Sequence, residues 1–119
     1  RRAGVRARLE HPLVALRAVL HGQEVTTDGR YVHLDGVRLE SPPTVPPPVL
    51  AGVRGPRSLA VAGRAADGVV LAEPATPSYV RAAREQAQGP ADLRVVAYEV
   101  AAVDDDVAAA RSLARAALR

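Results

Sequence analysis

Residues 47–71 read PPVLAGVRGPRSLAVAGRAADGVVL and decide the fold, because they predict a strand, a glycine-rich turn, a helix and a second strand. The apolar run 49–51 follows a proline cluster and suits a strand that is buried on both faces. Gly52 and Gly55 allow backbone conformations that are closed to other residues, and Pro56 has the φ of a first helical residue. The turn is therefore expected to lead directly into a helix.

The predicted helix ends beside Gly68, and a second strand follows it. Leu59, Ala62 and Ala66 recur at helical spacing and give the helix an apolar face. Gly68 is available for a left-handed cap, and the apolar run 69–71 resumes a buried strand. Since the whole unit takes only 25 residues, the two strands are predicted to be parallel neighbours joined by a right-handed crossover, which makes a βαβ unit.

The composition places the chain among globular domains of ordinary size. It has 119 residues, 48% of them hydrophobic, which is enough for a core. Phe, Trp, Met and Cys are absent, so packing depends on Ala, Val and Leu with three Tyr. The lack of cysteine excludes disulfides and thiolate metal sites and is typical of a reducing compartment. With no signal-like or membrane-spanning run, we expect a cytoplasmic protein.

The charge does not favour nucleic acid as a partner. The formal net charge is only +3, and every basic residue is Arg. Four arginines lie near the start of the chain, at positions 1, 2, 6 and 8, without the aromatic residues that form a base-stacking platform. We interpret them as the solvated face of a helix rather than as a nucleic-acid site.

Upstream of the βαβ unit, the pattern predicts a helix over 5–21, a hairpin over 24–34 and a proline-rich connector over 39–48. Leucines three or four residues apart give the helix its apolar face, with Pro12 either kinking it or opening its second half. The β-prone runs of the hairpin flank Asp28-Gly29, a typical two-residue turn. The connector is interpreted as stiff, extended structure rather than as a ligand for an SH3-type domain.

Downstream of the unit, the pattern predicts a helix over 77–88, a strand over 93–103 and a helix over 105–118. Thr76-Pro77 supplies an N-cap and a first-turn proline. Three consecutive aspartates, at positions 104–106, precede the last helix, and we interpret them as capping residues rather than as a metal site. Strands and helices alternate from residue 49 onward, so the predicted fold class is α/β.

Ligands of parallel α/β folds bind at the carboxyl ends of the strands, and two predicted loops lie there. The first is the turn formed by Gly52, Val53, Arg54 and Gly55, and the second covers residues 72–76. Because the first turn precedes a helix, its backbone N–H groups and the Arg54 side chain could bind a phosphate. A purely structural turn needs the same glycines, so both interpretations stay open.

One carboxylate, Glu73, lies just after a predicted buried strand. It could contact a substrate or transfer a proton, although an exposed or capping side chain is the simpler interpretation. His11, His21 and His33 have no ligand spacing, and we interpret them as structural or surface residues. The sequence therefore predicts no metal site and no complete catalytic constellation, and it leaves the catalytic residues unknown.

Several motifs follow one another over residues 12–72. They are a helix ending in L-x-G-x-x-V, a hairpin with T-x-x-G-x-Y, a proline-rich connector, P-V-x-x-A/G-x-x-G-P, and A-G-x-x-A-D-G before a strand. This course resembles the later part of the luciferase-like flavin-dependent oxidoreductases, especially the branch that uses the deazaflavin coenzyme F420. The ending DDDVAAARSLARAAL is similar to a following helix of that family. The resemblance implies a (β/α)8 TIM barrel, of which this chain would be less than half.

The resemblance also implies which residues meet the cofactor. It places the turn 52–55 along the deazaflavin or flavin and its phosphate-bearing tail. Some family members have a small residue where Arg54 stands, and a guanidinium could instead pair with phosphate. The sugar-phosphate dehydrogenase branch carries a lysine where Ala75 stands, with Glu73 nearby, which disfavours a phosphorylated sugar as substrate. The family's acidic and histidine residues at the reactive ring come from earlier barrel strands, outside this chain.

The function implied for the full-length protein is hydride transfer between a small-molecule substrate and F420 or a reduced flavin. An FMN-dependent monooxygenase is the first alternative, and a noncatalytic α/β module that binds acidic partners is the second. We expect no nucleic-acid or membrane partner and allow for a homodimer of the full-length protein. We expect the 119 residues alone to be inactive and poorly stable, since an open barrel segment leaves apolar strand edges uncovered.

Overall fold

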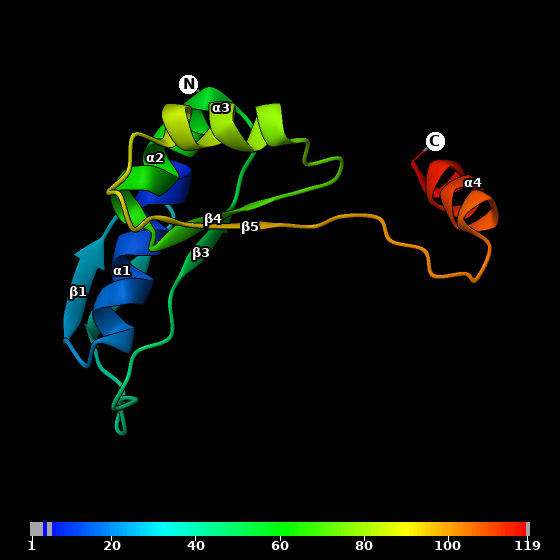
Figure 1. The fold of residues 1–119 in the computed structure, drawn as a ribbon. Helices are drawn as coiled ribbons and strands as arrows, with labels where there is room; N and C mark the ends of the chain where they lie inside the picture. Colours follow the sequence, from blue (N-terminus) through cyan, green and yellow to red (C-terminus); the bar gives the residue numbers. More distant parts are fainter. Residues whose placement is uncertain (1–3, 5, 119) are drawn as a thin grey trace.

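The computed structural model describes residue 4 and residues 6–118. Along the chain these residues form η1 (Arg6–Glu10, a π-helix), α1 (His11–Leu20), β1 (Val25–Asp28), β2 (His33–Val37), β3 (Leu50–Gly52), α2 (Pro56–Ala65), β4 (Gly68–Leu71), α3 (Pro77–Ala87), β5 (Arg94–Ala97) and α4 (Val107–Ala117). Strands β1 and β2 form an antiparallel hairpin, and β3, β4 and β5 form a parallel sheet in that order (Figure 1). The α/β class expected from the sequence is confirmed.

The core lies between the parallel sheet and helices α2 and α3. Ala51 of β3 and Val69 of β4 are 3% and 0% exposed, and they pack in one cluster with Leu59 of α2 and Ala83 of α3. The two helices approach each other closely at Gly63, where an added Cβ would overlap the carbonyl oxygen of Ala87. Small side chains therefore permit a thin, dense core in a chain without large apolar residues other than leucine and tyrosine.

Asp67 joins three elements at the amino ends of the parallel strands. Its carboxylate accepts one hydrogen bond from the Arg17 guanidinium and one from the Val49 N–H, both at 2.8 Å. Its backbone N–H donates to the carbonyl of Val49 at 2.8 Å, and its carbonyl accepts from the N–H of Arg94 at 3.1 Å. We call this set of contacts the Asp67 junction. It connects α1 to the entry of β3, and β4 to β5.

The glycines of the βαβ unit do not adopt the left-handed conformations expected of them. The expected left-handed cap at Gly68 is wrong, because α2 ends in extended backbone at Ala66 (φ −114°, ψ 167°) and Gly68 begins β4. Glycine is needed there for space, since a Cβ would clash with the carbonyl oxygen of Arg94 and the side chain of Leu50. Gly55, with φ −80° and ψ 153°, has a backbone that any residue adopts.

The helix expected over residues 5–21 consists of η1 and α1, which follow one another directly, with Glu10 in helical backbone (φ −66°, ψ −48°) where they meet. Residue 5, where the helix was expected to begin, lies outside the described residues. Pro12 lies in the first turn of α1, where its missing N–H costs no helical hydrogen bond, so it opens the second half rather than kinking one helix. The helix ends at Leu20, and Gly22 follows in the left-handed region (φ 76°).

The expected two-residue turn at Asp28-Gly29 is also wrong. Asp28 still belongs to β1 and pairs with His33, and the N–H of Gly29 donates to the carbonyl of Val32 at 2.9 Å. The chain therefore reverses over residues 30 and 31. Two side-chain contacts favour this register: Asp28 Oδ1 lies 2.7 Å from His33 Nδ1, and the Tyr31 ring lies against Arg8 of η1 (5.8 Å to the centroid).

Beyond α3 the elements are shorter than expected. The strand predicted over 93–103 ends at Ala97, because its partner β4 ends at Leu71 and the last ladder hydrogen bond runs from the N–H of Tyr98 to the carbonyl of Leu71 (3.0 Å). The helix predicted to 88 ends one residue earlier, with Gln88 in the left-handed region (φ 49°).

The last helix begins at Val107 rather than at 105, because Asp106 is its N-cap and has extended backbone. The Asp106 carboxylate accepts from the N–H of Ala108 at 2.8 Å, and Asp104 Oδ1 accepts from the N–H of Asp106 at 2.9 Å. Asp106 therefore caps α4, as expected. Among the described residues, no group of three or more acidic, histidine or cysteine side chains is arranged to hold a metal ion.

Helix α4 stands apart from the rest of the molecule. An extended segment of residues 98–106 leads to it, and the molecule measures 58 × 37 × 27 Å as a result (Figure 1). No residue of α4 is buried, and Leu113 on it is 58% exposed. Like the other helices within residues 6–118, α4 lacks the length and apolar character that a membrane crossing requires.

Candidate functional site

The carboxyl ends of the parallel strands border a pocket of about 390 Å³. Register pairs Gly52 of β3 with Val70 of β4, and the N–H of Val53 donates to the carbonyl of Val70 at 3.4 Å. The pocket is lined by Gly52, Val53, Arg54, Val70, Ala72 and Tyr98, and we call it the carboxyl-end pocket. Three of the four residues expected at a cofactor therefore lie together, at the end of the sheet where the sequence predicted a ligand. Gly55 does not line the pocket and is instead the N-cap of α2.

Neither glycine of the turn is required by the backbone or by packing within the chain. Gly52 and Gly55 lack left-handed φ values, and a Cβ built at either position meets no atom within 4 Å. Both residues are exposed. The turn thus presents bare backbone to open space, which is the arrangement that lets a ligand approach a main chain closely.

The amino end of α2 faces outward from this turn with unsatisfied donors. Gly55 provides no side-chain cap, Pro56 has no N–H, and the first helical bond runs from the N–H of Leu59 to the carbonyl of Gly55 at 2.9 Å. The N–H groups of the two residues between them therefore have no partner inside the helix. Together with the helix dipole, they make the end of the turn electropositive.

Arg54 places a guanidinium at the same edge. Its Cζ lies 5.8 Å from the centroid of the Tyr79 ring, within the range of a cation–π contact. Tyr79 is fixed in the first turn of α3, where its N–H donates to the Thr76 hydroxyl at 3.2 Å. The Tyr79 hydroxyl is buried without a hydrogen-bond partner in the structure. Arg54 thus connects the loop after β3 to the first turn of α3, and its side chain is exposed.

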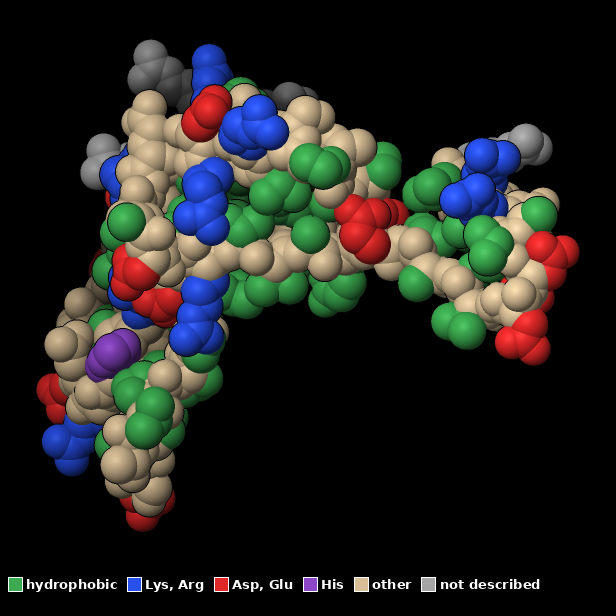
Figure 2. All heavy atoms as spheres, in the orientation of Figure 1, with side chains coloured by type: hydrophobic (Ala, Val, Ile, Leu, Met, Phe, Trp, Pro, Cys, Tyr) green, Lys and Arg blue, Asp and Glu red, His purple; other side chains and the backbone are tan. Residues whose placement is uncertain are grey.

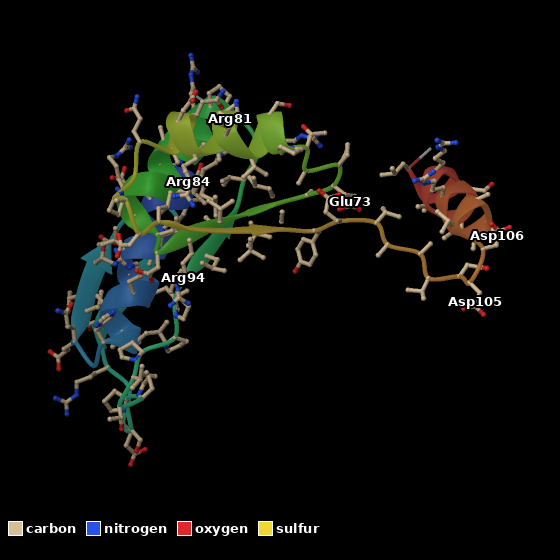
Figure 3. The ribbon with its side chains drawn as sticks, viewed as in Figure 1. Glu73, Arg81, Arg84, Arg94, Asp105 and Asp106 are labelled. Carbon is tan, nitrogen blue, oxygen red and sulfur yellow. The ribbon has the colours of Figure 1, made fainter. Side chains whose placement is uncertain are left out.

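Glu73 lies near the carboxyl-end pocket but does not line it. It is exposed in the loop that follows β4, immediately before a cis peptide bond to Pro74 (Figure 3). Ala75, where the resemblance implies a lysine in the sugar-phosphate branch, is 8% exposed and belongs to the core cluster. The structure therefore does not bring Glu73 into the set formed by Gly52, Val53 and Arg54.

Two residues of this region were missed by the sequence interpretation. Tyr98 lines the pocket, and Glu99 Oε1 accepts a hydrogen bond from the N–H of Ala75 at 2.9 Å, which ties the loop after β4 to the chain after β5. Both were hidden inside the strand predicted over 93–103. The apolar run 69–71 could have indicated that β5 is short, because a strand cannot pair beyond the end of its neighbour.

The chemistry of the pocket is that of binding. Its lining combines apolar side chains with one guanidinium, one phenol and open backbone, without a carboxylate or an imidazole. The three histidines lie elsewhere: His33 contacts Asp28 in the hairpin, His11 packs in α1 beside the hairpin, and His21 lies near the amino ends of the strands. Such a site can hold an anionic group next to an apolar, planar one.

Comparison with known proteins agrees with the motifs. A family model described as luciferase-like monooxygenase matches residues 3–119. An F420-dependent hydroxymycolic acid dehydrogenase of Mycobacterium tuberculosis is 30% identical over 111 residues, which are 88% of this chain and 31% of that protein. A 5,10-methylenetetrahydromethanopterin reductase of Methanolobus tindarius is 29% identical over 110 residues, 87% of this chain and 33% of the relative.

A third relative matches a shorter region. An F420-dependent glucose-6-phosphate dehydrogenase of Gordonia bronchialis is 38% identical over 64 residues, 54% of this chain and 19% of that protein. The chain spans about a third of the length of the first two relatives. Because the family model covers nearly all of the sequence, the resemblance is confirmed, and the chain belongs to the luciferase-like monooxygenase family.

Proposed function

We propose that this chain forms part of the cofactor site of an oxidoreductase that uses coenzyme F420. The observation that carries the proposal is the turn 52–55, where bare backbone, the amino end of α2 and the Arg54 guanidinium meet beside an apolar pocket. Three relatives whose names describe them as F420-dependent match 88%, 60% and 54% of this chain, and they support the same cofactor.

The residues present fit such a cofactor in two ways. An anionic tail would accept hydrogen bonds from the free N–H groups of the α2 amino end and pair with Arg54, which Tyr79 holds in place. A planar ring system would lie against the apolar walls of the pocket, formed by Val53 and Val70. The bound deazaflavin would itself supply the hydride chemistry, and this chain would bind and orient it.

We further propose that the parallel sheet is one sector of a (β/α)8 barrel. By the alternation of strands, Gly52, Val70 and Val96 lie on the face that α2 and α3 leave uncovered. Val96 is 41% exposed, and Tyr98 beyond it is 64% exposed. In a closed barrel this apolar face would turn inward, and the remaining strands would supply the acid and base groups that the carboxyl-end pocket lacks.

Glu73 remains our candidate for a substrate contact. It lies on the same end of the sheet as the pocket, outside its lining, and its side chain is exposed toward solvent. A carboxylate in that place would meet a hydroxyl or amino group of a small-molecule substrate.

The experiment is a titration of the full-length protein with F420 and, in parallel, with FMN, followed by cofactor fluorescence. We expect F420 to bind at least about tenfold more tightly than FMN, a difference of about 1.4 kcal/mol. Tighter binding of FMN would instead favour an FMN-dependent monooxygenase, the alternative that the family description supports. Binding of neither cofactor would refute both functions.

A further inference from the structure

A second pocket, of about 430 Å³, lies at the opposite end of the parallel sheet, around the Asp67 junction. Its walls come from the end of α1, the connector before β3, the end of α2 and the chain entering β5. Figure 2 shows basic and acidic side chains and a histidine gathered on this side of the molecule. We call it the amino-end pocket. It shares no lining residue with the carboxyl-end pocket.

Three guanidinium groups from three elements line the amino-end pocket: Arg17 of α1, Arg64 of α2 and Arg94 of β5. The Asp67 junction brings two of them together, because the Asp67 carboxylate holds the Arg17 guanidinium at 2.8 Å and the Asp67 carbonyl holds the backbone of Arg94 at 3.1 Å. Figure 3 shows Arg94 at the start of β5. Hydrogen bonds of Asp67 therefore fix the Arg17 guanidinium and the backbone of Arg94 at the same pocket.

The protein leaves several of these donors without acceptors. The Nε of Arg17 is buried and has no hydrogen-bond partner. Within residues 6–118, the Arg94 side chain makes no hydrogen bond or ion pair, although it is exposed at the pocket. Arg64 is engaged at both of its Nη atoms, since Nη1 donates to the carbonyl of Ala60 at 3.1 Å and Nη2 lies 3.8 Å from Glu10 Oε2. Guanidinium groups with unused donors are typical of sites for carboxylate or phosphate.

The acidic side chains around the pocket pair with Arg17 and Arg64 and leave the Arg94 guanidinium without a partner among the described contacts. Both oxygens of Asp67 are already occupied, by Arg17 and by the N–H of Val49. Asp92 is the second carboxylate of the lining, and it is exposed. With Glu10, which pairs with Arg64, three carboxylates stand against three arginines, and Arg94 is the one of the three arginines that has no carboxylate partner among the described contacts. Prolines at positions 46–48 and 90 also line the pocket, and their fixed φ angles make its walls stiff before any ligand binds.

We propose that the amino-end pocket binds a small oxyanion, and specifically a phosphate group, either free or carried as a monoester. Arg94 would supply the main charge-assisted hydrogen bonds, Arg17 would add its remaining Nη donor, and Asp92 would weaken binding by repulsion. This site is separate from the proposed cofactor site, because it lies at the other end of the strands and uses other residues.

The test measures phosphate binding to the full-length protein by isothermal titration calorimetry, with inorganic phosphate and with glycerol 3-phosphate as separate probes. Arg94→Gln is expected to weaken binding about tenfold, the loss of one charge-assisted contact. Asp92→Asn is expected to strengthen it about two- to fivefold, as the removal of a nearby exposed like charge does. Arg81→Gln, which removes an exposed arginine of α3 outside the lining, is the matched control and should leave the affinity unchanged.

The opposite signs of the two variants make the outcome decisive. Binding of inorganic phosphate alone would identify the free ion as the ligand, and binding of glycerol 3-phosphate alone would identify a monoester. Binding of both would show that the pocket recognises the phosphate group in either form. No binding of either probe would overturn the proposal. Equal weakening by Arg94→Gln and Arg81→Gln would also overturn it, because a diffuse charge effect would then explain the binding. The phosphate titrations use no cofactor, so their outcome does not depend on whether the proposed function is correct.

Discussion

Gly52 and Gly63 belong to the same βαβ unit, but the space around them differs. A Cβ at Gly63 would overlap the carbonyl oxygen of Ala87, whereas a Cβ at Gly52 would meet no atom within 4 Å. Packing within the chain thus requires a glycine at position 63, but it does not explain the glycine at position 52. An approaching ligand would account for Gly52.

This contrast predicts opposite effects for two matched substitutions in the full-length protein. Gly63→Ala should lower the free energy of unfolding by about 1–3 kcal/mol, because helices α2 and α3 must move apart. Gly52→Ala should change it by less than about 0.5 kcal/mol, yet weaken F420 binding. Thermal melts and F420 titrations measure both quantities. An unchanged F420 affinity in Gly52→Ala would mean that the turn is only structural.

Arg54 provides a second prediction at the residue scale. Arg54→Ala in the full-length protein should weaken F420 binding about tenfold, since one charge-assisted contact to the anionic tail is lost. Stability should hardly change, because the side chain is exposed. Arg111→Ala in α4 removes the same charge elsewhere and serves as the control in the titration. A loss of the same size in both variants would argue against a phosphate contact at Arg54.

Asp67 is expected to matter for stability rather than for cofactor binding. Asp67→Asn leaves only one acceptor oxygen for the Arg17 guanidinium and the Val49 N–H, so the free energy of unfolding should fall by about 2 kcal/mol. Asp92→Asn is the control, because Asp92 is exposed and carries no hydrogen bond among the described contacts. Chemical denaturation of the full-length protein would show the difference. Equal stability of the two variants would refute a structural role for the junction.

The residues of the candidate site were only partly predictable. Gly52, Val53 and Arg54 could be placed because a short strand, two glycines and a helix-starting proline fix where a βα turn lies. Tyr98 and Glu99 could not, since apolar residues continue past β5 and give no local signal for its end. The partner strand β4 decides that end, and its length is a tertiary property.

At the scale of elements, α3 depends on its amino-terminal cap. The Thr76 hydroxyl accepts from the N–H of Tyr79 at 3.2 Å, and Tyr79 in turn carries the Arg54 contact. Thr76→Ala should lower the free energy of unfolding by about 1 kcal/mol and loosen the position of Arg54. Thr76→Ser keeps the hydroxyl and should restore most of the loss. The melting temperatures of the two variants would test the cap: equal values would mean that the Thr76 hydroxyl does not stabilise α3.

The elements of the βαβ unit followed from the sequence because local chemistry specifies them. Pro56 starts α2, and apolar runs on both sides form parallel strands. The hairpin turn did not follow, although Asp-Gly is a strong turn signal. Contacts to Tyr31 from Arg8, far away in the sequence, and the Asp28–His33 pair favour a register displaced by two residues. Side-chain contacts outside the turn thus outweighed the turn residues.

At the scale of the whole molecule, apolar surface is left without cover. Val96 of the sheet is 41% exposed, and Val107, Leu113 and Leu118 of the α4 region are 51–61% exposed. Residues 1–119 alone should therefore unfold without a sharp transition and bind the hydrophobic dye ANS, because surfaces of this kind normally pack against other parts of a protein. Calorimetry would test this expectation. A cooperative transition with a midpoint equal to that of the full-length protein would contradict it.

The Asp67 junction also has a consequence for the order in which the chain folds. Its contact with Val49 spans 18 residues, and its contact with Arg17 spans 50. Closing the shorter loop costs less entropy, so the pairing of β3 with β4 can form before α1 docks. Losing the Arg17 contact should then mainly accelerate unfolding, whereas weakening the β3–β4 pair should mainly slow folding. The Asp67 carboxylate would thus take part in two steps of folding, the early pairing of β3 with β4 and the later docking of α1.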